Sequence, residues 1–423
     1  MQTTRNGIFS YLKLFFLHFL GFSIFYTLGS VFHFFVPITL ENYATWDGAW
    51  YKEIVYSGYS FDATKMSNVA FFPVFPLFWK LTGFNALVIS LVNYLLYGIA
   101  IVTLSFELQF NRKLFLFILC MPLQVFYMVP FTESLFFVFI TLAFWGYRKD
   151  YKSLIFIGLF AASATRPVLP MFLGGFIVLE MYRFLANSNR KYFIHFFNLS
   201  KNLLPVILGY FTAIYIHFHA TGVWFAQAKT YKHWGGYLSI PEFPLHTFEM
   251  GNAGYFVLQL DYLAMAWSFY CGFLVVRDVI KKKFEFQNEQ SLFVLCTSFM
   301  LIVLFIRLFT MHGSLWSLSR YVFASPIFLY TLYYVLIKKE DALKHLKTIF
   351  WLNFVLQAMF VHRGLINTWF VKFSAVNAFS GVYFLREKIS EKYSNYLFYS
   401  VCLACFVLQL YFLNWYLKVI WVG

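Results

Sequence analysis

The stretch YLKLFFLHFLGFSIFYTLGSVFHFFV, from Tyr11 to Val36, decides the fold class. It is longer than the roughly 20 apolar residues that an α-helix needs to cross a hydrocarbon core. It also exceeds the core of a signal peptide and lacks a small-residue cleavage site, so we interpret it as an uncleaved first span. The segment before it, Met1 to Gly7, is short and carries only Arg5.

The composition of the whole chain agrees with a membrane protein. Of 423 residues, 61% are hydrophobic, 24% are aromatic and 12% are charged, whereas a soluble domain has about 25% charged residues. Phe alone occurs 59 times, which is too much apolar surface for one buried core. The bilayer must therefore act as the solvent for most of the chain.

The net charge of +15 does not indicate a nucleic-acid partner, because the basic residues lie in short clusters between apolar runs. These clusters are Arg112-Lys113, Arg148-Lys149, Arg190-Lys191, Lys281-Lys282-Lys283, Lys338-Lys339 and the pair Lys344 and Lys347. Clusters that recur in every second loop are typical of the cytoplasmic loops of membrane proteins.

We predict one polytopic all-α membrane domain over residues 1–423, with about 11 to 13 transmembrane helices. The predicted spans are 11–36, 84–106, 114–130, 134–147, 153–165, 168–185, 203–220, 255–276, 292–310, 321–337, 349–361, 370–385 and 397–417.

Two segments between spans are long: residues 37–83, the first long loop, and residues 221–254, the second long loop. With the N-terminus inside, most Lys and Arg residues fall in cytoplasmic loops, so both long loops are predicted outside. We expect a bacterial inner membrane with the site facing the periplasm, or the endoplasmic reticulum membrane and its lumen if the host is eukaryotic.

The first long loop contains the most informative polar residues. Asp47-Gly48 is a helix start and Ser57-Gly58 a helix stop. Between them, the apolar residues recur at helical spacing: Trp50, Tyr51, Ile54 and Val55. The pattern predicts an amphipathic helix lying on the membrane surface.

A sugar transferase that uses a lipid-phosphate donor needs a carboxylate and aromatic rings at the membrane surface. The attacking hydroxyl loses a proton to a base, and a carboxylate within hydrogen-bond reach can act as this base. Cations must stabilise the leaving phosphate, and aromatic rings offer flat faces for a sugar. Asp47, flanked by Trp46, Trp50 and Tyr51, meets the first and last needs. The alternatives are that Asp47 only caps its helix and the rings only anchor at the interface, or that Asp62 is the base.

Five motifs carry a family resemblance. They are Trp46–Ile54 (WDGAWYKEI) with Gly58-Tyr59, Phe71–Pro76 (FFPVFP), Thr132–Phe136 (TESLF), Thr165-Arg166, and Ser319-Arg320-Tyr321 with Pro326. In their order and spacing, over roughly residues 11–330, they resemble the GPI mannosyltransferase II (PIG-V type) family.

The resemblance implies a GT-C fold, a multi-span bundle whose first outer loop holds the catalytic acid. It implies inverting transfer of mannose from a polyprenyl-phosphate mannose, with Asp47 as the base. Beyond Tyr330 no motif matches, and the second long loop, with Gln227, Lys229 and His233, resembles the family only loosely. The acceptor is therefore left open among a glycan, a glycolipid and a protein.

Arg166 and Arg320 are the predicted ligands of the donor phosphate, since charges at the ends of spans must either pair or function. The alternative is that they form ion pairs with Glu133 or Asp261. Glu133 either orients an Arg or is a second acid. Lys229 and His233 belong to a basic, aromatic-flanked cluster that either binds phosphate or is solvated.

No nucleotide-binding or metal-ligand motif occurs, so no metal or other cofactor is expected and a membrane lipid carries the donor sugar. Two other functions remain open. One is a GT-C transferase for another sugar or for a protein acceptor. The other is a transporter or flippase of a lipid-linked sugar, which would often show inverted repeats and midplane charges.

Overall fold

The computed structural model describes residues 2–186, 192–243, 245, 251–281, 288–339, 341–360 and 390–422. Throughout these ranges the regular structure is helical, which confirms the prediction of an all-α polytopic membrane protein. Seven helices are long and apolar enough to cross a membrane. They are α1 (Gln2–Val31), α4 (Ala86–Glu107), α8 (Leu169–Ala186), α9 (Tyr192–Thr221), α11 (Gly251–Ile280), α12 (Asn288–Thr310) and α17 (Glu391–Leu417).

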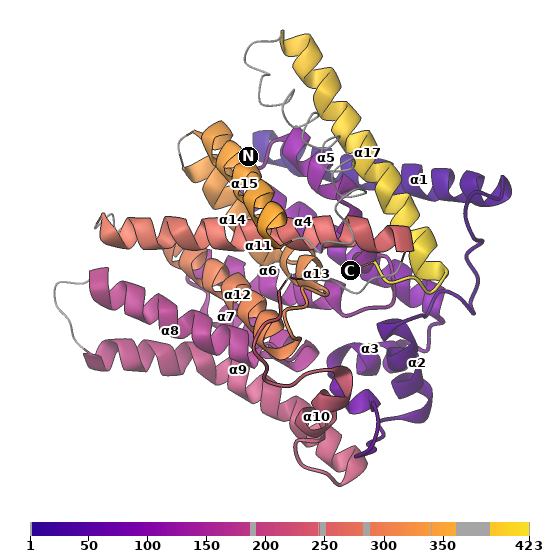
Figure 1. Ribbon diagram of the computed structural model, residues 1–423, viewed down its shortest axis with the longest axis vertical. Helices are drawn as coiled ribbons and strands as arrows, with labels where there is room; N and C mark the ends of the chain where they lie inside the picture. Colours follow the sequence, from indigo (N-terminus) through magenta and orange to yellow (C-terminus); the bar gives the residue numbers. More distant parts are fainter. Residues whose placement is uncertain are drawn as a thin grey trace.

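Shorter helices complete the bundle and the loops. In the bundle these are α6 (Glu133–Lys149), α7 (Lys152–Thr165) and α15 (Ala342–Phe360). The first long loop contains α2 (Asp47–Ser57), the 3-10 turn η1 (Asn68–Ala70) and α3 (Val74–Thr82), and the second contains α10 (Ala226–Thr230) and the 3-10 turn η3 (Tyr231–Trp234). Helices α2, α3 and α10 lie together at one end of the long helices (Figure 1).

The predicted span 114–130 is wrong as a continuous helix. Helix α5 (Arg112–Cys120) ends within this span, and a 3-10 segment, η2 (Pro122–Tyr127), follows it. Pro122 has no N–H to continue the helix, and it forces Met121 out of the helical region, to φ −58° and ψ 135°.

The predicted span 321–337 is also interrupted. Its residues form α13 (Leu318–Phe323), α14 (Pro326–Tyr333) and a π-helical turn, η4 (Tyr334–Lys338). Ser325 is extended before Pro326 and its hydroxyl accepts a hydrogen bond from the Ile327 N–H at 3.0 Å, so it caps α14. This break allows α13 to turn Arg320 into the protein.

Helix α9 begins at Tyr192, well before the start predicted for the span 203–220. The predicted span 370–385 lies outside the described residues.

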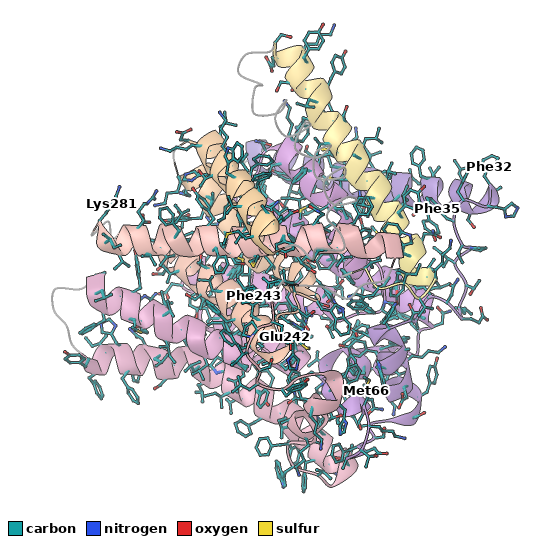
Figure 2. The ribbon with its side chains drawn as sticks, viewed as in Figure 1. Phe32, Phe35, Met66, Glu242, Phe243 and Lys281 are labelled. Atoms are coloured by element: carbon teal, nitrogen blue, oxygen red, sulfur yellow. The ribbon has the colours of Figure 1, made fainter. Side chains whose placement is uncertain are left out.

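The two ends of the bundle can be identified from α6, whose first residue is Glu133 and whose last turn carries Arg148 and Lys149. At 1.5 Å per residue these ends are about 24 Å apart along the helix. Met66 and Glu242, one from each long loop, lie far from Lys281 at the other end of α11 (Figure 2). Both long loops lie at the Glu133 end, because Arg320 pairs with Asp47 of the first loop as well as with Glu133, and His233 of the second loop contacts Ala63 of the first.

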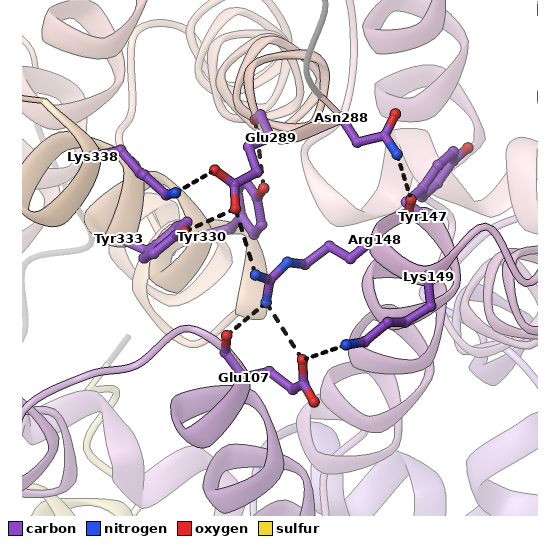
Figure 3. Close-up of polar contacts among 9 residues, drawn as sticks. All are labelled: Glu107, Tyr147, Arg148, Lys149, Asn288, Glu289, Tyr330, Tyr333 and Lys338. Carbon is purple, nitrogen blue, oxygen red and sulfur yellow. Dashed lines mark hydrogen bonds and ion pairs between the residues drawn. The ribbon is translucent and has the colours of Figure 1, made fainter.

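The Arg148 end is closed by a polar network that joins α4, α6, α12 and η4 (Figure 3). Arg148 Nη1 donates to the Glu107 carbonyl oxygen at 2.8 Å, and Nη2 lies 3.5 Å from Glu289 Oε1. Glu289 also accepts from the Tyr333 hydroxyl at 2.9 Å and from Lys338 Nζ at 2.9 Å. Arg148 thus links α6 to both α4 and α12.

Replacing Arg148 with Ala is expected to destabilise the protein by about 1–3 kcal/mol, because hydrogen bonds to charged groups contribute about that much. The Arg148 side chain is only 21% exposed, so water replaces its contacts poorly. Thermal unfolding in detergent measures the change. Lys152→Ala, at an exposed position on α7, is the matched control. Equal unfolding midpoints for the two variants would contradict a structural role for the network.

Candidate functional site

Helix α2 positions Asp47. It runs from Asp47 to Ser57 and ends at Gly58, whose φ of 81° favours glycine, as the sequence predicted. The residue before it, Trp46, has a φ of 51°, which is uncommon for a bulky non-glycine residue. Strain of this kind persists only where the surroundings hold it, and it clusters at functional sites.

Gly48 lets the start of α2 approach the rest of the protein closely. A Cβ atom at this position would be 3.1 Å from Pro130 Cγ and 3.2 Å from the Tyr416 hydroxyl oxygen. The tight packing therefore favours the glycine of the WDG motif, and it places Asp47 beside the start of α6.

The apolar face of α2 was predicted to lie on the membrane surface, and the structure corrects this. Tyr51 and Ile54 are each 5% exposed and pack in a cluster with Phe75 and Trp79 of α3. The loop folds on itself, because two short amphipathic helices can bury their apolar faces against each other.

Four predicted site residues meet in one ion-paired group, which we name the Arg320 cluster: Asp47, Glu133, Arg166 and Arg320. Arg320 Nη1 lies 2.7 Å from Asp47 Oδ2, and Arg320 Nε donates to Glu133 Oε1 at 2.5 Å. Arg166 Nη2 donates to the same Glu133 oxygen at 3.2 Å. The ion pairing with Glu133 that the sequence analysis left open is confirmed.

Burial differs sharply within the cluster. The side chain of Glu133 is 0% exposed and that of Arg320 is 5% exposed, whereas that of Asp47 is 25% exposed. Glu133 is therefore shielded from solvent behind the arginines with which it pairs, and Asp47 is the most exposed carboxylate of the cluster.

Asp261 is the other carboxylate that the sequence suggested as a partner for the arginines, and it contacts the backbone beside Arg320. Its Oδ1 accepts from the Ser319 N–H at 2.8 Å, next to Arg320 at the start of α13. Asp261 on α11 thus helps to fix the helix that carries Arg320.

Aromatic rings enclose Arg320. Its guanidinium carbon lies 4.6 Å from the ring centre of Phe131, 4.8 Å from that of Phe126 and 5.5 Å from that of Trp421. Such cation–π contacts stabilise a cation that has lost its water. Phe126 belongs to the 3-10 segment η2, so the broken span contributes directly to the site.

Trp421 is a site residue that the sequence analysis missed. Its ring packs edge-on against Trp46 at 5.1 Å and against Trp316 at 5.9 Å. The end of α17 is held nearby, where the Tyr416 hydroxyl donates to the Tyr43 carbonyl oxygen at 3.0 Å. No local signal marked Trp421, since it follows the last span and matches no motif. Only the return of α17 to α2 brings it to the cluster.

Trp50 and Tyr51, the other predicted site residues of α2, lie in different environments. Trp50 stacks on Phe71 at 6.1 Å and contacts Trp234 of the second long loop at 5.3 Å. Tyr51 is buried, and burial raises the pKa of its hydroxyl far above the ordinary value, so it stays neutral. Trp50 is half-buried and therefore more accessible than Tyr51.

The predicted residues of the second long loop contact other partners than the Arg320 cluster. Gln227 is buried and accepts from the Tyr210 hydroxyl at 3.3 Å. His233 Nε2 lies 2.9 Å from the Ala63 carbonyl oxygen in the first long loop, and Lys229 is exposed. These residues therefore hold or border the contact between the two loops.

Asp62, the rival base, lies in an exposed turn. Hydrogen bonds from the Thr64 hydroxyl and N–H hold the pKa of its carboxyl below the usual value, and Lys65 Nζ lies 3.5 Å away. Its described contacts are local to the turn, which favours Asp47 over Asp62 as the functional carboxylate.

Within the described residues, no group of three or more His, Cys, Asp or Glu side chains is arranged to hold a metal ion. Comparisons of the chain with protein-family models, with curated proteins and with solved structures found no match.

Proposed function

We propose that this chain is an integral-membrane glycosyltransferase of the GT-C type. It transfers mannose from a polyprenyl-phosphate mannose to an acceptor hydroxyl, with inversion, and Asp47 is the general base. The observation that carries the proposal is the Arg320 cluster. Its four residues come from four separate motifs of the family resemblance, and they meet although as many as 187 positions separate two hydrogen-bonded members.

The cluster offers the groups that this reaction needs. In an inverting transfer the acceptor hydroxyl attacks the anomeric carbon directly, so one base is sufficient and no second nucleophile is required. Asp47, at 25% exposure, takes the proton. The arginines stabilise the negative charge that develops on the leaving phosphate.

Arg320 Nη1 lies 2.7 Å from Asp47 Oδ2, so an ion pair engages the carboxylate of the proposed base. The sugar of a bound donor, lying along the cluster, would compete with Asp47 for Arg320 Nη1. Glu133 meanwhile keeps Arg320 in place through Nε. Donor binding would thus release Asp47 for catalysis at the moment when the sugar is present.

The expected site faces the periplasm of a bacterium, or the lumen in a eukaryotic host. There both long loops contact the acceptor, which is a glycan, a glycolipid or a protein. Trp46 and Trp50, with Tyr51 behind them, would frame the sugar. Gln227, Lys229 and His233 would border the acceptor, because the second long loop packs on the first.

The proposal is tested with the full chain purified into nanodiscs. We expect transfer of radiolabelled mannose from polyprenyl-phosphate mannose to one member of a panel of glycan, glycolipid and peptide acceptors. Polyprenyl-phosphate glucose serves as the comparison donor, and preference for it would point to a GT-C enzyme for another sugar. A donor that stays intact with every acceptor, but that the protein moves across a vesicle bilayer, would establish the transporter instead.

A further inference from the structure

Arg307 is a cation near the Arg320 cluster that the proposed function does not use. It lies in the last turn of α12 and is half-buried. Among the described residues, no Asp or Glu lies within ion-pair distance of it. Its guanidinium carbon is 4.6 Å from the ring centre of Tyr321. A partly buried arginine whose described contact is a ring, and not a carboxylate, has donors to offer to an anion.

Tyr321 connects Arg307 to the cluster. The guanidinium carbon of Arg166 lies 4.8 Å from the same ring centre, so two cations share one tyrosine. The charges of Arg307, Arg166 and Arg320 all act on the Tyr321 hydroxyl. Contacts therefore run without a gap from Asp47 through Arg320, Glu133 and Arg166 to Tyr321 and Arg307. With two carboxylates against three arginines, the excess positive charge is at the Arg307 end.

Arg320 has few hydrogen-bond donors left for a ligand, and Arg166 is more buried than Arg307. Arg320 is engaged by two carboxylates and enclosed by three rings, and the Arg166 side chain is 9% exposed. Arg307 is the more accessible cation. It is about 27 Å along α12 from Glu289 at the Arg148 end, which is close to the thickness of a hydrocarbon core. If α12 spans the bilayer with Glu289 at one face, Arg307 lies near the headgroups of the other face.

We propose that Arg307, together with Arg166 and the hydroxyl of Tyr321, binds the phosphate of a polyprenyl phosphate. This assignment rests on the proposed function for the identity of the donor. It moves the phosphate from Arg320, the ligand expected from the sequence, to the far side of Tyr321. The sugar then extends along the cluster toward Asp47. The bond that breaks joins the anomeric carbon to a phosphate oxygen, so it lies between the ligands of the phosphate and Asp47.

Binding is measured without any transfer step, so that the result is independent of the proposed reaction. The full chain in nanodiscs is titrated with a fluorescent short-chain polyprenyl phosphate that carries no sugar. The variants are Arg307→Gln, Arg307→Lys and Tyr321→Phe, with Lys80→Gln as the control at an exposed position on α3. Phosphatidic acid and inorganic phosphate are the competitors.

We expect Arg307→Gln to weaken binding about 10- to 100-fold, as loss of a hydrogen bond to a charged group does. Arg307→Lys should recover part of the affinity, and Lys80→Gln should bind as the unsubstituted protein does. Wild-type affinity in both Arg307 variants would overturn the site and leave Arg307 as a cation that stabilises the end of α12. Equally strong competition by phosphatidic acid or by inorganic phosphate would overturn the assignment to polyprenyl phosphate. Arg307-dependent binding in a protein that transfers no sugar would uphold the site and reject only the proposed reaction.

Discussion

Replacing Asp47 with Asn is expected to lower the rate of mannose transfer by about 10²- to 10⁴-fold, the usual contribution of a general base. Asn keeps the size of the side chain and a hydrogen-bond acceptor for Arg320, but it cannot take a proton. Because the Asp47 side chain is 25% exposed, loss of its charge should leave the fold intact. Initial rates with radiolabelled donor, at saturating donor and acceptor, measure the effect.

Two controls make this result specific. Asp62→Asn removes a carboxylate from the same loop, outside the cluster, and should transfer at the rate of the unsubstituted protein. Binding of a sugar-free polyprenyl phosphate to Asp47→Asn should be retained, which separates loss of the base from loss of the site. If instead Asp62→Asn is inactive and Asp47→Asn transfers normally, the base has been assigned to the wrong carboxylate.

Replacing Glu133 with Gln is expected to have the largest effect on stability. Glu133 is fully buried and accepts from both Arg166 and Arg320, so its neutralisation leaves two buried cations for one remaining carboxylate. Breaking a buried ion pair by removing one partner costs about 3–5 kcal/mol. We expect a lower unfolding temperature in detergent, and loss of transfer in any protein that still folds.

The matched control is Glu242→Gln, since the Glu242 side chain is 76% exposed and its described ionic contact is His312 at 3.9 Å. A second variant, Glu133→Gln with Arg166→Gln, removes one cation with the anion. The double variant should lose less stability than the sum of the losses in the two single variants, because the residues act as one unit. Additive effects, or a Glu133→Gln midpoint equal to that of the control, would show that Glu133 does not hold the arginines.

Much of the architecture followed from local pattern. A membrane protein was predictable because apolar runs as long as 11–36 have no other stable environment. Helix α2 was predictable from Asp47-Gly48 at its start and Ser57-Gly58 at its end, since caps and turns depend on neighbouring residues. The breaks at Pro122 and Pro326 were missed because hydropathy averages over a window and hides a single proline in an apolar run.

For the site, the sequence identified the residues, and the tertiary structure decided their pairing. Residue chemistry and motifs singled out Asp47, Glu133, Arg166 and Arg320 by themselves, because charges are rare in so apolar a chain and conspicuous where they occur. Which carboxylate pairs with which arginine was decided only by the tertiary structure. Pairing depends on distances between residues far apart in the chain, and one-dimensional spacing does not contain them. For the same reason the sequence was silent on Trp421, and on the Tyr321 ring that Arg166 and Arg307 share. Their roles arise where α17, α13 and α12 pack together, since aromatic and cationic side chains acquire a function only from the partners that the packing gives them.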